Sequence, residues 1–302
     1  MPTIASGLDY VDVRFLGYPQ IIATGVLHGR SGVALVDPGP HTTLKHLTAE
    51  LGRRGIAIAD LTELLLTHIH LDHAGATGQL VRLNPRLKVY VHSVGAPHLV
   101  DPTRLLASAA KLYGEDMQRL WGDVLDVPAA NVHALEGGER LSAGGRELRI
   151  AYTPGHAKHH VAYFDDASGV AFVGDTLGIR RPPGTYVMPP TPPPDIDLHA
   201  WPLSVERILG WGPSTIFLTH FGPFTDVRTH ADELVARLRE WASLARALLH
   251  RADLTDAQRL ERFVEEVRLD LRRRMSPQDA EAYDRSGRID YSWLGLARAV
   301  RK

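Results

Sequence analysis

Apolar and polar residues alternate along most of the chain in a pattern that predicts strands and helices in turn. Between about residues 10 and 220, short runs of Val, Ile and Leu are bounded by Gly or Pro turns and separated by helical patterns. This alternation is typical of an α/β fold. The strands expected from it cover residues 21–27, 33–36, 64–67, 88–91, 148–153, 161–164, 170–173 and 216–219.

Beyond Asp226 the pattern becomes purely helical. Leu234, Leu238 and Trp241 begin a series in which apolar residues recur every three or four positions, and the series resumes at Leu260. Positive and negative charges balance along this tail, which favours a solvated outer face on helices that pack against a core. We therefore expect a catalytic domain over residues 1–226 and a helical C-terminal extension over residues 227–302.

Two further segments bear on where a site could lie. Residues 181–195 contain seven prolines, and proline fixes φ and lacks an N–H donor, so this segment is predicted to be a stiff, extended loop. We expect it to form a wall over the site. Residues 96–121 have a helical pattern, and they either line the other side of the same pocket or belong to the core.

Composition narrows the classes of function. Lys and Arg number 34 against 35 Asp and Glu, which gives a formal net charge of -1 and no overall field that would attract nucleic acid or an anionic membrane. The sequence shows neither a secretory signal nor an apolar run long enough to span a bilayer, so a cytoplasmic location is expected. Cysteine is absent, which excludes thiolate metal ligands and a cysteine nucleophile.

One short segment contains four potential metal ligands close together. Directly after the strand expected at residues 64–67, the sequence places His68, His70, Asp72 and His73 within six residues. Two histidines separated by one residue can bind one ion, whereas an Asp-His pair at the start of the next helix can bind a second. The spacing therefore predicts a site for two metal ions.

Four other apolar runs end in a polar residue close to Gly or Pro. The residues at these strand ends are Asp37, His156, Asp175 and His220. Functional side chains often sit on loops at one edge of a rigid sheet, because the sheet fixes their geometry. We expect these strand ends to complete the site built by the histidine-rich segment.

This combination resembles the metallo-β-lactamase-fold hydrolase superfamily, whose HxHxDH motif and later His, Asp and His match the chain over about residues 10–225. The resemblance implies an αββα sandwich and two metal sites. In it, one metal would be held by His68, His70 and His156 and the other by Asp72, His73 and His220, with Asp175 bridging them and Asp37 supporting the site from behind the ligands.

Ligands of this kind suit two Zn²⁺ ions, and they also suit iron or manganese. Two ions that share a water lower its pKa from about 15.7 toward neutrality, so a hydroxide nucleophile is available without a protein base. Asp72 and Asp175 are accordingly the predicted catalytic carboxylates. The expected reaction is hydrolysis of a small-molecule ester, thioester or lactone.

Within the superfamily, residues 153–156 and the helical tail are most similar to the glyoxalase II branch, whose members cleave glutathione thioesters. The sequence offers no basic pair to bind glutathione, so the acyl substrate is left open. The alternative from another reaction class is a persulfide dioxygenase, which would bind one iron ion in place of the two metal ions of a hydrolase. A zinc β-lactamase, a phosphodiesterase and a non-catalytic binding protein are less favoured, and a homodimer is one of the open oligomeric states.

Tyr186 and Met188 lie in the Pro-rich loop between two of the predicted ligands. We expect them to contact the substrate, with Tyr186 polarising its carbonyl group. The other interpretation is that both side chains anchor the loop by packing, since aromatic residues bury much apolar area.

Overall fold

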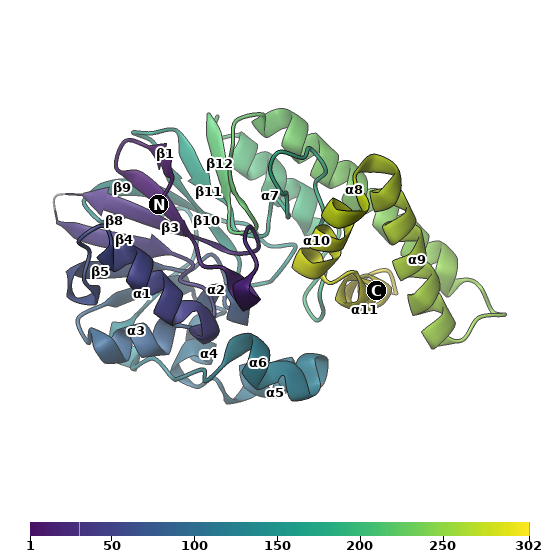
Figure 1. Ribbon diagram of the computed structural model, residues 1–302, viewed down its shortest axis with the longest axis horizontal. Helices are drawn as coiled ribbons and strands as arrows, with labels where there is room; N and C mark the ends of the chain where they lie inside the picture. Colours follow the sequence, from purple (N-terminus) through teal and green to yellow (C-terminus); the bar gives the residue numbers. More distant parts are fainter. Residues whose placement is uncertain (30, 302) are drawn as a thin grey trace.

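The computed structural model describes residues 1–29 and 31–301, and within them the strands form two sheets that pack face to face (Figure 1). The first sheet contains seven strands in sequence order: β1 (Thr3–Ala5), β2 (Leu8–Asp12), β3 (Ala23–Gly29), β4 (Gly32–Val36), β5 (Leu61–Leu65), β6 (Lys88–His92) and β7 (Val132–Leu135). The second contains six, in the order β13 (Gly222–Phe224), β12 (Thr215–Leu218), β11 (Val170–Phe172), β10 (Val161–Asp165), β9 (Arg146–Tyr152) and β8 (Arg140–Ala143).

Strand direction follows the length of the connections. In the first sheet β1 to β4 pair antiparallel and are joined, within the described residues, without an α-helix, whereas β4 to β7 pair parallel and are joined by segments that contain α-helices. In the second sheet only β11 and β12 are parallel. A parallel connection needs a crossover of a dozen or more residues, and α7 supplies it between β11 and β12.

Helices lie on the outer faces of the sandwich and at its C-terminal end (Figure 1). None of the helices in the described residues is both long and apolar enough to cross a bilayer. Their bounds are α1 (Leu44–Gly52), α2 (Leu71–Ala74), α3 (Thr77–Leu83), α4 (Ala96–Val100), α5 (Thr103–Tyr113), α6 (Met117–Trp121), α7 (Ala200–Leu209), α8 (Val227–Leu249), α9 (Asp256–Arg274), α10 (Pro277–Gly287) and α11 (Ile289–Ala299).

Three apolar layers show that the chain is an αββα sandwich. One layer lies between the first sheet and the helices on its outer face, where Leu47 of α1 packs in the same cluster as Val89 of β6. The middle layer lies between the sheets and contains Leu27 and Phe172. The third joins the second sheet to α7 and α8. The predicted fold class is therefore confirmed.

Each of the eight predicted strands overlaps one of β3, β4, β5, β6, β9, β10, β11 and β12. The sequence pattern did not reveal β1, β2, β7, β8 and β13, of which all but β2 lie at an edge of a sheet. An edge strand buries fewer side chains and so lacks a continuous apolar run. Residues 181–195 form neither helix nor strand, as their proline content predicts.

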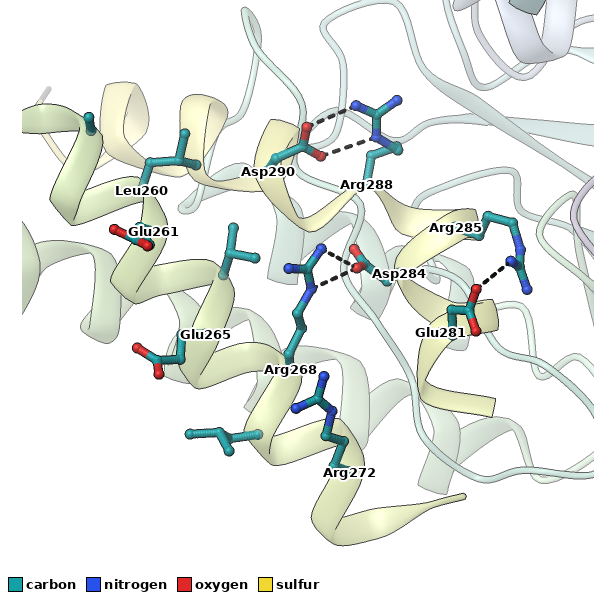
Figure 2. A pocket seen from close by; sticks show the side chains of 13 residues that line it. Leu260, Glu261, Glu265, Arg268, Arg272, Glu281, Asp284, Arg285, Arg288 and Asp290 are labelled. Atoms are coloured by element: carbon teal, nitrogen blue, oxygen red, sulfur yellow. Dashed lines mark hydrogen bonds and ion pairs between the residues drawn. The ribbon is translucent and has the colours of Figure 1, made fainter. Parts of the chain in front are cut away.

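The C-terminal helices pack on one another and on the Pro-rich loop through a fourth apolar cluster that includes Trp241, Phe263 and Trp293. A groove of about 830 Å³ runs between α9 and the pair α10 and α11 (Figure 2). Most of its arginines are paired within the groove: Arg268 pairs with Asp284 at 2.6 Å and Arg288 with Asp290 at 2.8 Å, whereas Arg272 has no ion pair among the described residues. The helical tail is thus present. Its status as a separate domain from residue 227 stays a prediction.

The contact between the sheets depends on Phe172. Its ring is fully buried and lies 5.4 Å, between centroids, from the ring of Phe217. Opposite it on β3 stands Gly25, where a Cβ atom would lie only 2.9 Å from Cε1 of Phe172. A residue without a side chain is therefore required at this position for the sheets to approach.

We expect Phe172→Ala to lower the free energy of unfolding by about 3–5 kcal/mol, because it leaves a cavity between the sheets. Urea unfolding followed by circular dichroism measures the change. Leu203→Ala on α7 is the matched control, since Leu203 is 58% exposed and its loss should change stability by less than about 0.5 kcal/mol. Equal effects in the two variants would contradict the packing described here.

Candidate metal centre

The predicted ligands converge at one edge of the sandwich, because each follows the end of a strand. The segment after β5 carries four of them and runs into α2, which begins at Leu71. His156 follows β9, Asp175 follows β11 and His220 follows β12. Ligands from both sheets therefore meet in one place.

Three imidazole rings form the first group of donor atoms. Nε2 of His68 and Nε2 of His156 each lie 3.0 Å from Nδ1 of His70. Two ligand nitrogens at about 2.1 Å from one tetrahedral ion are separated by about 3.4 Å. The observed spacing is close to this value, so the three nitrogens are placed to share one metal ion.

The second group consists of Asp72, His73 and His220. Nε2 of His220 lies 3.2 Å from Nε2 of His73 and 3.4 Å from Oδ2 of Asp72. His73 and His220 are buried, and Asp72 is partly exposed. These atoms form a second possible metal site beside the first.

Asp175 lies between the two groups. Its Oδ2 atom is 3.3 Å from Nε2 of His156 in the first group, and its Oδ1 atom is 3.3 Å from Nε2 of His73 in the second. Within residues 1–29 and 31–301, Oδ1 is a buried oxygen with no hydrogen-bond partner. A buried carboxylate oxygen without a donor is costly unless a cation satisfies it. The residues therefore fit a pair of bound metal ions.

The ligand histidines are held by acceptors on their far side. Nδ1 of His156 donates to the carbonyl of Pro190 at 2.8 Å, and Nδ1 of His220 donates to the carbonyl of Ile21 at 2.7 Å. A carbonyl oxygen can only accept, so each Nδ1 carries the proton and each Nε2 keeps its lone pair for a metal. Pro190 belongs to the Pro-rich loop, which thus orients a ligand directly.

Asp37 orients His73 in the same way, but with a carboxylate as the hydrogen-bond acceptor in place of a backbone carbonyl. Its Oδ2 atom accepts hydrogen bonds from Nδ1 of His73 at 2.8 Å, the hydroxyl of Thr67 at 2.7 Å and the hydroxyl of Thr219 at 2.8 Å. Its Oδ1 atom accepts from the backbone N–H of Thr67 at 2.8 Å. Asp37 is fully buried and has φ of +50°, a conformation that Asp tolerates better than most residues.

Comparison with known proteins identifies the family. The sequence description of the metallo-beta-lactamase superfamily matches residues 17–220, about two thirds of the chain. The chain belongs to this superfamily. Its match to the metallo-beta-lactamase fold-containing protein ST1585 of Sulfurisphaera tokodaii is 28% identical over 220 residues, which is 72% of this chain and 78% of that protein.

Relatives with named activities in the superfamily match over a shorter stretch. A hydroxyacylglutathione hydrolase of Synechococcus is 31% identical over 144 residues, which is 48% of this chain and 43% of that enzyme. The thioesterase pkgB of Emericella nidulans is 26% identical over 186 residues, which is 59% of this chain and 44% of that enzyme. The chain thus spans less than half the length of either enzyme.

Solved structures of the superfamily agree on the fold. The metallo-beta-lactamase family protein TTHA1429 from Thermus thermophilus superposes with a TM-score of 0.66 and 27% identity, over 82% of this chain and 84% of that one. TTHA1623, solved in a di-iron-bound form, gives a TM-score of 0.53 and 27% identity, over 70% of this chain and 93% of that one. The fold is thus shared with a protein that has bound two iron ions.

Burial and mutual repulsion keep the first group of histidines neutral. Burial and the nearby His73 lower the pKa of His68 well below its usual range, and burial with the nearby His156 lowers the pKa of His70 to about 4. Burial also lowers the pKa of His156, although Asp175 opposes this shift. Neutral imidazole is the form that binds a metal, so this group needs no deprotonation at neutral pH.

The second group carries charge in the metal-free protein. Burial works to lower the pKa of His73 and of His220, but the neighbouring carboxylates, Asp175 first among them, raise both. Burial likewise works to raise the pKa of Asp72, yet His73 and His220 lower it to about 2. Protonated histidines and ionised carboxylates therefore stabilise one another where the ion would bind.

The structure places His160, which the sequence pattern did not assign to the site, beside the candidate ligands. Its Nδ1 atom lies 2.8 Å from the hydroxyl of Thr153, and its Nε2 atom accepts from the backbone N–H of Asp175 at 3.2 Å. Its ring stacks on that of His68 at 5.0 Å between centroids. The signal in the sequence was only its position four residues after His156. His160 holds the backbone of Asp175 in place.

The loop that carries His156 requires the glycine before it. Gly155 has φ of +141°, and a Cβ atom there would lie 2.4 Å from Cβ of Trp201. Trp201 is fully buried, and its ring nitrogen donates to the carbonyl of Thr176 at 2.7 Å. The first turn of α7 therefore presses directly on this loop and fixes the direction of His156.

A cavity of about 590 Å³ opens beside the metal centre, and His70 is part of its lining. One wall is α5, as the helical pattern at residues 96–121 allowed, and another is the Pro-rich loop at residues 192–195. The far wall comes from α11 near the end of the chain. This volume suits a small or medium-sized organic substrate. We call this cavity the cleft.

Tyr186 and Met188 do not line the cleft, so the structure corrects their predicted substrate contact. Met188 has no exposed surface, and Tyr186 is only 6% exposed. Both belong to the cluster that joins the Pro-rich loop to the C-terminal helices, where the ring of Tyr186 lies 5.4 Å from that of Tyr283. The packing interpretation is the one the structure supports, because apolar area under the loop is buried by these side chains.

We expect Asp37→Asn to weaken metal binding by about 10- to 100-fold, since outer partners of ligand histidines have effects of this size. Asn tolerates the same backbone conformation, but either orientation of its amide turns an NH₂ group toward donors that Asp37 now accepts from. Where the NH₂ group takes the place of Oδ2, His73 would move its proton to Nε2 and lose the lone pair that binds metal. Competition with a chromogenic chelator measures the affinity. Wild-type affinity in a folded variant would contradict this role.

The raised pKa values of His73 and His220 predict that metal binding releases protons. The neighbouring carboxylates favour the doubly protonated form of both rings in the metal-free protein, and Nε2 must lose its proton to bind an ion, so binding should release protons and the release should decline at higher pH. Apparent affinity should accordingly increase as pH rises. Calorimetric titration in buffers of different ionisation enthalpy gives the count. Heats that do not depend on the buffer would contradict the assignment.

Proposed function

We propose that the chain is a binuclear metal-dependent hydrolase that attacks the carbonyl group of an ester, thioester or lactone, with zinc as the metal. The observation that carries the proposal is the position of Asp175. One of its oxygens faces each group of candidate ligands, so this one carboxylate would help to hold both ions. The first group alone could hold a single ion, so a one-metal site would not account for the clustering of Asp72, His73 and His220.

Two bound ions supply a hydroxide near neutral pH and polarise a carbonyl oxygen. The protein's own residues position the two ligand groups and the substrate. Asp175 sets the separation of the two groups, and Asp72 presents a partly exposed carboxylate at the second one. His70 lines the cleft, so a substrate held there lies next to the metal centre. Relatives named as a hydroxyacylglutathione hydrolase and a thioesterase support an acyl substrate.

Metal content is the first test of the proposal. Protein purified without chelator or added metal should contain about two zinc ions per chain by elemental mass spectrometry. Asp175→Ala and His220→Ala should lose metal, whereas His250→Ala, at an exposed helix end, should retain it. About one iron per chain, with oxygen consumed on a persulfide, would overturn the hydrolase and favour the dioxygenase.

Activity is the second test. A panel of aryl esters, thioesters and lactones should be hydrolysed by the wild type and by His250→Ala. Chelation, Asp175→Ala or His220→Ala should reduce the rate to background, because each removes the source of the nucleophile. Preferential cleavage of bis(4-nitrophenyl) phosphate over every carbonyl substrate would contradict the proposed reaction.

A further inference from the structure

The cleft beside the metal centre has apolar walls that the protein itself covers only in part. Within the described residues, α5 contains no fully buried side chain, which is unusual for a helix of eleven residues in a compact fold. Leu105, Ala109 and Leu112 follow one another at helical spacing and line the cleft. Across from them, Leu294 of α11 is 42% exposed. Apolar surface of this kind marks a place where an apolar group binds.

The same two helices bring positive charge to the cleft. Arg104, Ser108 and Lys111 lie at helical spacing along α5, and Arg298 lies one turn beyond Leu294 on α11. Arg104, Lys111 and Arg298 are exposed and have no ion-pair partner among residues 1–29 and 31–301. A fourth cation, Lys158, is paired with Asp195 at 3.2 Å. Three positive charges therefore line the cleft without forming an ion pair within the described residues.

The groove between α9 and α10–α11 provides the contrast. Four arginines line that groove as well. Arg268 of α9 pairs across it with Asp284 of α10, and Arg285 and Arg288 pair with carboxylates close to them in the sequence (Figure 2). Three of the four arginines in the groove are thus paired with a carboxylate, whereas Arg104, Lys111 and Arg298 at the cleft are not paired within the described residues. A concave surface lined with charge of one sign raises the local concentration of ligands of the opposite sign.

We propose that the substrate is an amphiphilic anion: an ester or thioester with an apolar segment for α5 and α11 and a negatively charged group for Arg104, Lys111 and Arg298. This inference rests on the proposed function, because it takes His70 to be a metal ligand at the cleft. In the reaction, water forms the new C–O bond, the bond to the leaving oxygen or sulfur breaks, and the leaving atom takes a proton.

Three chromogenic esters of equal acyl length test the inference. 4-Nitrophenyl octanoate is neutral, 4-nitrophenyl hydrogen suberate carries a carboxylate on the acyl chain, and 3-carboxy-4-nitrophenyl octanoate carries one on the leaving group. At least one anionic ester should have a lower KM than the neutral ester. The one that does shows whether the cleft binds a negative charge on the acyl chain or on the leaving group. Added salt should raise the KM of that ester more than the KM of the neutral one, because exposed charges are screened.

Charge removal in the cleft supplies the matching variants. Arg104→Gln, Lys111→Gln and Arg298→Gln should each raise the ratio of the anionic to the neutral KM by about threefold, the effect of one partly exposed ion pair. The triple variant should abolish the preference. Arg239→Gln is the control, because Arg239 is an exposed arginine of α8 outside the lining of the cleft.

The outcomes separate this inference from the proposed function. If all three esters are hydrolysed with one KM that the variants and salt leave unchanged, the anionic substrate is wrong and the hydrolase stands. If no ester is hydrolysed, the anionic cleft can still be tested by binding alone. Suberate and 5-hydroxy-2-nitrobenzoate, the charged halves of the two anionic esters, are titrated calorimetrically into the metal-loaded protein. Binding that the triple variant loses and Arg239→Gln retains supports the anionic cleft, and equal binding in all proteins overturns it.

Discussion

The buried carboxylate of Asp37 is the constraint on which the rest of the structure depends. A charge with no access to water is unfavourable unless donors surround it, and here four hydrogen bonds do so. Thr67 follows β5 in the first sheet, and Thr219 follows β12 in the second. One carboxylate therefore joins the two sheets at the edge where the ligands lie, and it orients His73 at the same time.

The clustering of the candidate ligands and the fold class could be predicted because each depends on local sequence. An apolar run that ends in a polar residue indicates a strand end, and strand ends on one side of a sandwich meet. The histidine-rich segment adds residue types that bind metal. Asp37, His156, Asp175 and His220 were therefore found before any coordinate was known, although they lie far apart in the chain.

Other features depend on contacts between distant segments and left no local signal. Edge strands such as β8 bury too few residues to show a pattern. Tyr186 and Met188 were assigned to the substrate because they lie between ligands in the sequence, but the C-terminal helices cover them. The wall of the cleft formed by α11 was missed for the same reason, since Arg104 and Arg298 come together only when α11 returns to face α5.

The two parts of the candidate site come from different stretches of the chain. All seven candidate ligands lie between residues 68 and 220, whereas one wall of the cleft is formed by Leu294 and Arg298. Substitutions in α11 can therefore change the lining of the cleft without moving a candidate ligand. In evolution, such an arrangement lets the cluster at the strand ends be inherited unchanged while the shape and charge of the cleft diverge, because selection on α11 is separated from selection on the cluster.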